Sequence, residues 1–120
     1  MTQALPPQLA AQLDLLGLGA GFVPPPEVGL AARQGLALRR RHGRGGTEVG
    51  LARAATLAAL RPHSAREMRV IAAWFARFAY LRGRGRWDDA ANPSTGYIAW
   101  LLWGGDAGRA WVEARRADWS

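Results

Sequence analysis

The pattern of apolar and polar positions along the chain predicts a protein built from α-helices alone. Apolar residues recur at three- and four-residue spacing over most of the length, and no alternating stretch of strand length interrupts them. The most apolar stretch spans residues 92–111, in which every position from Tyr97 to Trp103 is apolar or aromatic. Because such a helix has no polar stripe, we expect it to lie at the centre of the hydrophobic core.

Five main helices are expected, and each has a start or stop signal in the sequence. Their predicted ranges are 26–41, 48–60, 65–82, 95–103 and 107–117. Pro26 suits the first turn of the first helix, and Gly43 suits the stop that follows it. Thr47, Ser94 and Asp106 are the predicted N-caps of the second, fourth and fifth helices.

The third helix, over residues 65–82, has the clearest pattern. The sequence from Ser64 to Glu67 is a capping box, in which each side chain bonds the backbone N–H of the other residue. Its core face is expected to comprise Met68, Ile71, Ala72, Phe75, Phe78 and Ala79. Its arginines fall on the opposite side, and Trp74 falls at the boundary between the two faces.

The composition of the other helices predicts how they pack. The second helix is Ala-rich and nearly apolar all round, Val49 included, so we expect it to be buried between neighbours. Gly35 lies in the apolar face of the first helix, where the missing side chain would let another helix approach closely. Trp100, Trp103 and Trp111 are expected in the core.

The length of 120 residues suits one domain, which we expect to be a compact bundle preceded by an arm. Residues 1–26 combine an apolar segment, 9–18, with several glycines and a run of three prolines. This composition predicts a loosely attached arm and a stiff linker, followed by a helical domain over residues 27–120. The sequence leaves open whether the arm docks on the domain through Leu13, Leu16 and Phe22.

Several classes of protein are excluded by what the sequence lacks. There is no cysteine, so disulfides and thiolate metal sites are ruled out. No apolar run approaches the roughly 18 residues of a membrane-spanning helix, and the N-terminus lacks the pattern of a secretory signal. We therefore expect no membrane partner.

The charge distribution points to an anionic partner. All 16 basic residues are arginines, and residues 33–86 hold thirteen of them against two glutamates, a charge of +11 between two mildly acidic segments. Such asymmetry favours nucleic acid or an acidic protein surface. If the first and third helices pack side by side, their arginines are expected to form one surface. The predicted contact residues are Arg39, Arg40, Arg41, Arg44, Arg66, Arg69, Arg77, Arg82, Arg84 and Arg86.

Two tryptophans, Trp87 and Trp119, lie in polar surroundings, and we expect them to be exposed. An exposed tryptophan beside arginine can stack on a base or anchor a protein partner. The alternative for the arginines themselves is a solvated basic face without a partner, which is common on helical domains.

No arrangement of residues predicts catalysis, a cofactor or a bound metal. The glycine-rich loop over residues 43–46 lacks the preceding strand of a nucleotide-binding fingerprint and the lysine of a P-loop. Asp88 and Asp89 are expected to be solvated loop residues. His42 and His63 flank helix ends without a nearby nucleophile or acid at a suitable spacing, so we expect two exposed loop histidines.

The chain resembles a small domain that recurs in bacteriophage and prophage proteins, sometimes beside virion-assembly segments. The resemblance lies in the Gly-Arg-Gly-Gly-Thr loop at 43–47, the helix over 64–78, and Pro-Ser-x-Gly-x-Ile-Ala-Trp-x-Leu-Trp-Gly-Gly-Asp-Ala-Gly at 93–108. The chain departs from it at Phe78, where the family often has histidine, and in a shorter, more basic loop at 83–92. The resemblance implies a phage origin and a helical domain, and brings no established activity.

These observations predict a phage-encoded, non-enzymatic module that binds nucleic acid through its central arginines. The alternative hypothesis is a protein-interaction module, either a virion-assembly or packaging component or an inhibitor of a host protein with an acidic face. Either function implies a location in the host cytoplasm or the virion.

Overall fold

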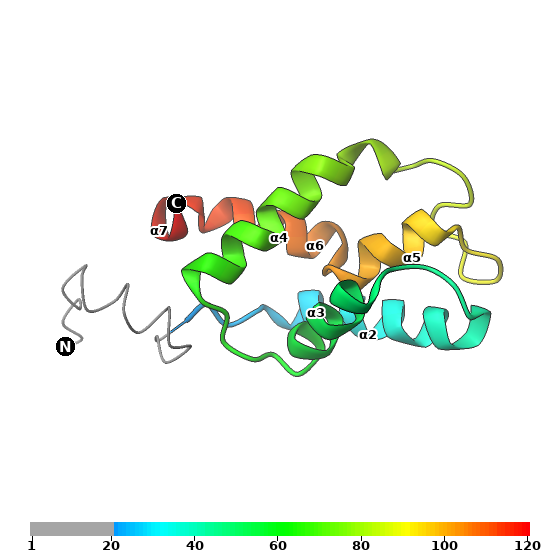
Figure 1. The fold of residues 1–120 in the computed structure, drawn as a ribbon, viewed down its shortest axis with the longest axis horizontal. Helices are drawn as coiled ribbons and strands as arrows, with labels where there is room; N and C mark the ends of the chain where they lie inside the picture. The colour runs from blue at the N-terminus through cyan, green and yellow to red at the C-terminus, as the bar shows by residue number, and fades with distance from the viewer. Residues whose placement is uncertain (1–20) are drawn as a thin grey trace.

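The structure is a computed structural model that describes residues 21–120, and helices account for most of them (Figure 1). The predicted apolar segment 9–18 and the docking of Leu13 and Leu16 lie outside the described residues. The observed elements are α2 (Pro26–His42), α3 (Glu48–Ala58), α4 (Ala65–Phe78), the 3₁₀ turn η1 (Ala79–Leu81), α5 (Thr95–Leu102), α6 (Gly105–Ala114) and α7 (Arg116–Trp119). The prediction of an all-α bundle of about five main helices is confirmed.

The local signals at the helix ends are also confirmed. Gly43 ends α2 with a φ of 65°, in the left-handed region that glycine adopts without strain. The side chain of Thr47 accepts a hydrogen bond from the N–H of Gly50, and that of Ser94 accepts one from Tyr97. At the start of α4, both bonds of the capping box form.

The expected cap at Asp106 is wrong. Helix α6 begins two residues earlier than predicted, at Gly105, and its N-cap is Gly104, whose φ is 110°. Asp106 therefore lies inside the first turn, and its Oδ1 accepts a hydrogen bond from Trp100 Nε1 at 2.9 Å. The two glycines make the corner themselves, which leaves the carboxylate to tie α6 back to α5.

Helix α5 lies at the centre of the core, as its composition predicts. It packs on α2, α3 and α6, while α4 packs on α6 and α7 (Figure 1). Trp100, Trp103 and Trp111 are buried, as expected. Gly35 lets α2 approach α5 closely, because a Cβ at this position would lie only 2.7 Å from the backbone nitrogen of Leu102.

Two expectations about faces have different outcomes. On α4, Met68, Ile71, Ala72 and Phe75 are buried and Trp74 lies at the boundary, as predicted. Phe78 and Ala79, also expected on the core face, are only half-buried, because the α-helix ends at Phe78. Helix α3 is not buried all round, since its buried residues are Gly50, Ala54 and Leu57 and the Val49 side chain is 63% exposed. Its many alanines make both sides apolar, so the pattern does not show which side faces solvent.

The described chain starts beside the beginning of α4. Phe22 and His63 form an isolated antiparallel bridge, with N–H to O=C distances of 2.6 and 2.8 Å. Phe22 is half-buried against the core, so this residue of the segment before α2 does dock on the helical domain. No helix within residues 21–120 has the length and apolar character needed to cross a membrane.

Candidate nucleic-acid interface

The two arginine-bearing helices do not pack side by side, so the predicted arginines do not form one continuous surface. Helix α2 packs on α3, α5 and α6, whereas α4 packs mainly on α6 and α7. Figure 1 shows that the C-terminal end of α2 and the loop over residues 82–94 share one end of the molecule, while α4 begins at the other. The ten predicted residues are therefore divided along the length of the domain.

Six of the ten belong to the segments at one end of the molecule, here named the basic end. They are Arg39, Arg40, Arg41, Arg44, Arg84 and Arg86. All except the half-buried Arg39 are exposed. Within residues 21–120, none of the six forms an ion pair with a carboxylate, so each retains an uncompensated positive charge.

A pair of hydrogen bonds from Arg44 joins the two loops of the basic end. Its guanidinium donates to Asn92 Oδ1 at 3.0 Å and to the carbonyl oxygen of Pro93 at 2.8 Å. The next residue, Ser94, donates its N–H to the carbonyl oxygen of Arg86 at 3.2 Å. Arg44 and Arg86 are thus linked through three consecutive residues, and the loops that carry them are held together.

The two carboxylates of this loop have local partners. Asp89 Oδ1 accepts hydrogen bonds from the backbone N–H groups of Ala91 and Asn92, and Asp88 accepts one from the hydroxyl of Tyr97 at 3.1 Å. Burial raises the pKa of Tyr97, and the neighbouring Asp88 raises it further, so the phenol stays protonated as a donor. These acids stabilise the loop, and neither forms an ion pair with the basic end.

Arg82 is an exception among the predicted residues because its charge is already matched. Its guanidinium forms two bonds with the carboxylate of Asp106, at 3.0 and 2.7 Å. The bond from Arg82 lowers the pKa of Asp106, and the indole N–H of Trp100 lowers it further. This ion pair joins the residue after η1 to the first turn of α6, so we exclude Arg82 from the candidate interface.

The remaining three predicted arginines lie along α4, away from the basic end. Arg69 donates to the backbone carbonyl of Trp119 at 2.8 Å and holds the C-terminal turn. Arg77 lies over the ring of Phe78, with its guanidinium carbon 5.2 Å from the ring centroid. Arg66 is exposed in the first turn of the helix.

The expectation that Trp87 and Trp119 are exposed is wrong. Trp119 is 4% exposed, and its indole N–H donates to the carbonyl oxygen of Val112 at 2.7 Å. Trp87 is half-buried, with its ring centroid 5.2 Å from that of Tyr97 and 5.5 Å from that of Trp100. Trp119 is buried because α7 folds back onto α4, and Trp87 is half-buried because it packs on α5. The polar neighbours of both residues in the sequence gave no indication of these contacts.

Tyr80, an exposed aromatic residue beside Arg84 of the basic end, was not predicted from the sequence. Its side chain is 58% exposed, and the guanidinium carbon of Arg84 lies 5.8 Å from its ring centroid. The signal in the sequence was its position, three residues after Arg77 and four before Arg84; it lies in η1, directly after α4. An exposed ring beside an arginine can stack on an unpaired base.

His63 is not the exposed loop residue that we expected, because it is 1% exposed. The strand-like pairing with Phe22 covers it, and the ring of Trp111 packs at a right angle to it, 5.9 Å away. Its Nδ1 donates to the carbonyl oxygen of Arg61 at 2.7 Å, since a carbonyl can only accept. His42 is also more buried than expected, at an intermediate level.

The second ring nitrogen of His63 contacts the hydroxyl of Thr56, which also lies within hydrogen-bonding distance of a carbonyl oxygen. Nε2 lies 3.1 Å from the hydroxyl of Thr56, which in turn lies 2.9 Å from the carbonyl oxygen of Arg53. The hydroxyl has one proton, so a neutral His63 requires it on the Nε2 side. Burial lowers the pKa of His63 and favours this neutral form, although the nearby Glu67 opposes the shift.

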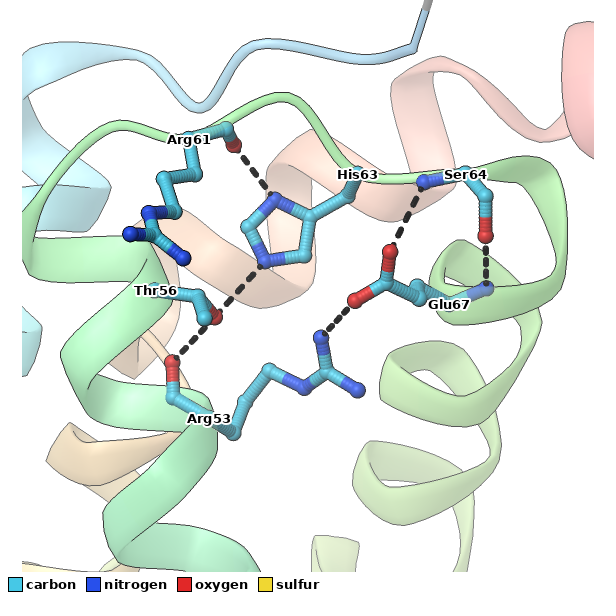
Figure 2. Close-up of polar contacts among 6 residues, drawn as sticks. All are labelled: Arg53, Thr56, Arg61, His63, Ser64 and Glu67. Carbon is cyan, nitrogen blue, oxygen red and sulfur yellow. Dashed lines mark hydrogen bonds and ion pairs between the residues drawn. The ribbon is translucent and has the colours of Figure 1, made fainter. Parts of the chain in front are cut away.

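Ser64, His63 and Glu67 lie close together in Figure 2, but their bonds are those of a helix cap. Ser64 Oγ accepts from the N–H of Glu67, and Glu67 Oε1 accepts from the N–H of Ser64, both at 3.1 Å. The other oxygen of Glu67 pairs with Arg53 at 2.6 Å. Burial tends to raise the pKa of Glu67, but the bonds from Arg53 and Ser64 outweigh it and lower the pKa. Within residues 21–120, the hydroxyl of Ser64 therefore has no hydrogen-bonded base that could activate it as a nucleophile.

No group of three or more potential metal-ligating side chains occurs in the described part of the chain. A search of protein-family models, of curated proteins and of solved structures finds no match to the chain. The resemblance to phage domains consequently rests on the motifs in the sequence, and it stays a prediction.

Proposed function

We propose that this domain is a phage- or prophage-encoded, non-enzymatic module that binds nucleic acid through the basic end. The observation that carries the proposal is the group of six arginines without a carboxylate partner, on two loops and a helix end that hydrogen bonds join. The planar guanidinium group binds phosphate oxygens through paired hydrogen bonds. Arginines held on one surface can bind several phosphates of one strand at once.

Exposed Tyr80 suits single-stranded nucleic acid better than a regular duplex. A tyrosine ring beside Arg84 can stack on an unpaired base, whereas paired bases in a duplex present only their edges. Contacts of this kind carry little sequence information, so we expect similar affinity for strands of different sequence. A location in the host cytoplasm or in the virion follows from the proposed origin.

Fluorescence anisotropy with labelled single-stranded oligonucleotides over a range of salt concentrations tests this function. If all six arginines contact phosphates, the slope of log K against log salt should approach about −4, from the coefficient of roughly −0.7 per contact for single strands. Absence of binding at low salt, or binding that salt does not weaken, would contradict the proposal.

A matched pair of double substitutions locates the contact. Arg40→Gln with Arg41→Gln should weaken binding and reduce the slope by about 1.4, from the same coefficient. The control, Arg115→Gln with Arg116→Gln, removes the same charge from two exposed residues whose partners are Asp118 and Glu113. Equal loss of affinity in both variants would mean that net charge alone drives the binding.

An acidic protein face is the alternative partner for the same arginines, and affinity capture distinguishes the two. If the proposal holds, nuclease treatment of a host lysate should release whatever the domain retains. Retention of one stoichiometric protein after nuclease, together with weak oligonucleotide binding, would favour a virion-assembly or inhibitory role instead.

A further inference from the structure

Helix α4 and the turn η1 carry a second apolar stripe, which the other described helices cover only in part. Val70, Trp74, Phe78 and Leu81 follow one another at spacings of four, four and three residues, beside the core face of Met68 and Phe75. Within the described residues, Val70 is 44% exposed, and the other three are half-buried. An apolar stripe left at the surface beside a well-formed core suggests contact with a partner.

Trp74, Phe78 and Leu81 of this stripe form one wall of a groove, here named the α3–α4 groove. The opposite wall is the loop before α3, at Gly46 and Thr47, and the floor comes from α5. The residues that line it are Gly46, Thr47, Trp74, Phe78, Leu81, Thr95, Gly96, Ala99 and Trp103. The rings of Trp74 and Trp103 stack nearly parallel, with centroids 5.2 Å apart, so the base of the groove is rigid and aromatic.

The volume of the groove decides what kind of ligand it suits. It measures about 280 Å³, slightly below the range of roughly 300 to 1,000 Å³ for sites that enclose a drug-sized molecule. A single large side chain from another protein fits this space better. Val49, 63% exposed on the α3 side, and Val70 on the α4 side extend the apolar surface beyond it.

The charges around the groove indicate the chemistry of the partner. Arg77 lies over the ring of Phe78 at its edge, and Arg66 precedes Val70 by one helical turn; neither forms an ion pair within residues 21–120. The carboxylate of Glu67 is already paired with Arg53, which leaves Glu48 as the acid on the α3 side. The edge is therefore net positive and complements an acidic segment.

We propose that the α3–α4 groove binds an acidic segment of a partner protein that inserts an aromatic or leucine side chain against Trp74 and Trp103. A symmetric dimer through this face would bring two net-positive edges together, which like-charge repulsion disfavours. Nucleic acid offers phosphates for the arginines but no aliphatic anchor for an apolar floor. The groove adjoins the basic end through the loop at Gly46 and Thr47, but none of the six arginines of the basic end lines it.

Selection from a random-peptide display library on the full chain tests the proposal. Enriched peptides should combine aspartate or glutamate with an aromatic residue or leucine. In an NMR titration of the full chain, a selected peptide should shift the indole N–H signals of Trp74 and Trp103. Enrichment of basic peptides, or shifts caused by an oligonucleotide and by no peptide, would overturn the inference.

Variants on the floor of the groove supply the control. Thr95 is exposed at the first position of α5, where an acid suits the helix dipole, so Thr95→Glu should fold. It should weaken peptide binding by about tenfold or more, because it sets like charges together. Thr95→Gln, without the charge, and Leu30→Glu, at a 61% exposed site on α2, should retain most of the affinity. Unchanged affinity for Thr95→Glu would refute the site.

Discussion

Replacing Gly35 by alanine should separate α2 from α5, although alanine is the better helix former. A Cβ at residue 35 would lie 2.7 Å from the backbone nitrogen of Leu102, 3.0 Å from the carbonyl carbon of Leu101 and 3.1 Å from its Cβ. Ordinary contact between such atoms requires about 3.5 to 4.0 Å. Two of the three neighbours are main-chain atoms, which cannot rotate away, so the whole helix has to move.

The expected change in the free energy of unfolding of Gly35→Ala follows from two opposing effects. Overpacking of a tight core costs about 1 to 3 kcal/mol, and a clash with backbone belongs at the upper end of that range. Replacing glycine by alanine within a helix returns about 1 kcal/mol. The net loss for Gly35→Ala should be about 2 kcal/mol, or roughly 10 °C in Tm for a domain of this size.

Gly96→Ala is the matched control, because it makes the same chemical change in a helix. A Cβ there would meet only the flexible side chain of Leu81, at 3.5 Å or more, which is ordinary contact. We expect this variant to equal or exceed the parent protein in stability, by up to about 1 kcal/mol. Chemical denaturation followed by tryptophan fluorescence gives both values. Equal stabilities for the two variants would refute the close approach of α2 and α5.

Two further predictions concern buried polar groups. The pKa of His63 in the folded protein lies below the ordinary value of 6.5, so as the pH falls the unfolded chain binds the proton before the folded protein does. The contribution of neutral His63 to the free energy of unfolding is therefore fully present above about pH 6.5 and decreases below it. His63→Gln should flatten this dependence in denaturation experiments between about pH 7.5 and pH 5, and an unchanged slope would contradict it. Asp106→Asn keeps an acceptor for Trp100 Nε1 and loses an exposed ion pair, so it should cost about 1 kcal/mol or less. Asp106→Ala leaves the buried indole N–H of Trp100 without an acceptor and should cost about 1 to 3 kcal/mol. Equal losses of stability in the Asn and Ala variants would argue against the hydrogen bond from Trp100 to Asp106.

The features that the sequence predicts correctly are those set within a few residues. The caps at Thr47, Ser64 and Ser94 and the stop at Gly43 depend on a side chain or a φ angle and its immediate neighbours. The central position of α5 follows from a run so apolar that no exposed arrangement is stable. Local chemistry is sufficient in each case.

Apart from the cap at Asp106 and the burial of α3, the incorrect predictions concern contacts between segments that are distant in the sequence. Trp119 has polar neighbours, and its burial depends on a turn that Arg69, fifty residues earlier, holds in place. The buried His63 pairs through its backbone with Phe22 and packs against Trp111, and none of these contacts has a signal in the sequence. The same holds for the candidate interface. Arg82 and Arg84 have similar neighbours in the sequence, and only the fold brings Asp106 to Arg82 as an ion-pair partner.

The two ends of the described chain lie on the side of the domain away from the basic end (Figure 1). The bridge between Phe22 and His63 holds one beside the start of α4, and the bond from Arg69 to Trp119 holds the other on the same helix. Attachment to a sensor surface through Ser120 would consequently present the arginines to solution. A long polyanion would then approach them without passing the point of attachment, and the same geometry would serve a domain displayed on a larger assembly.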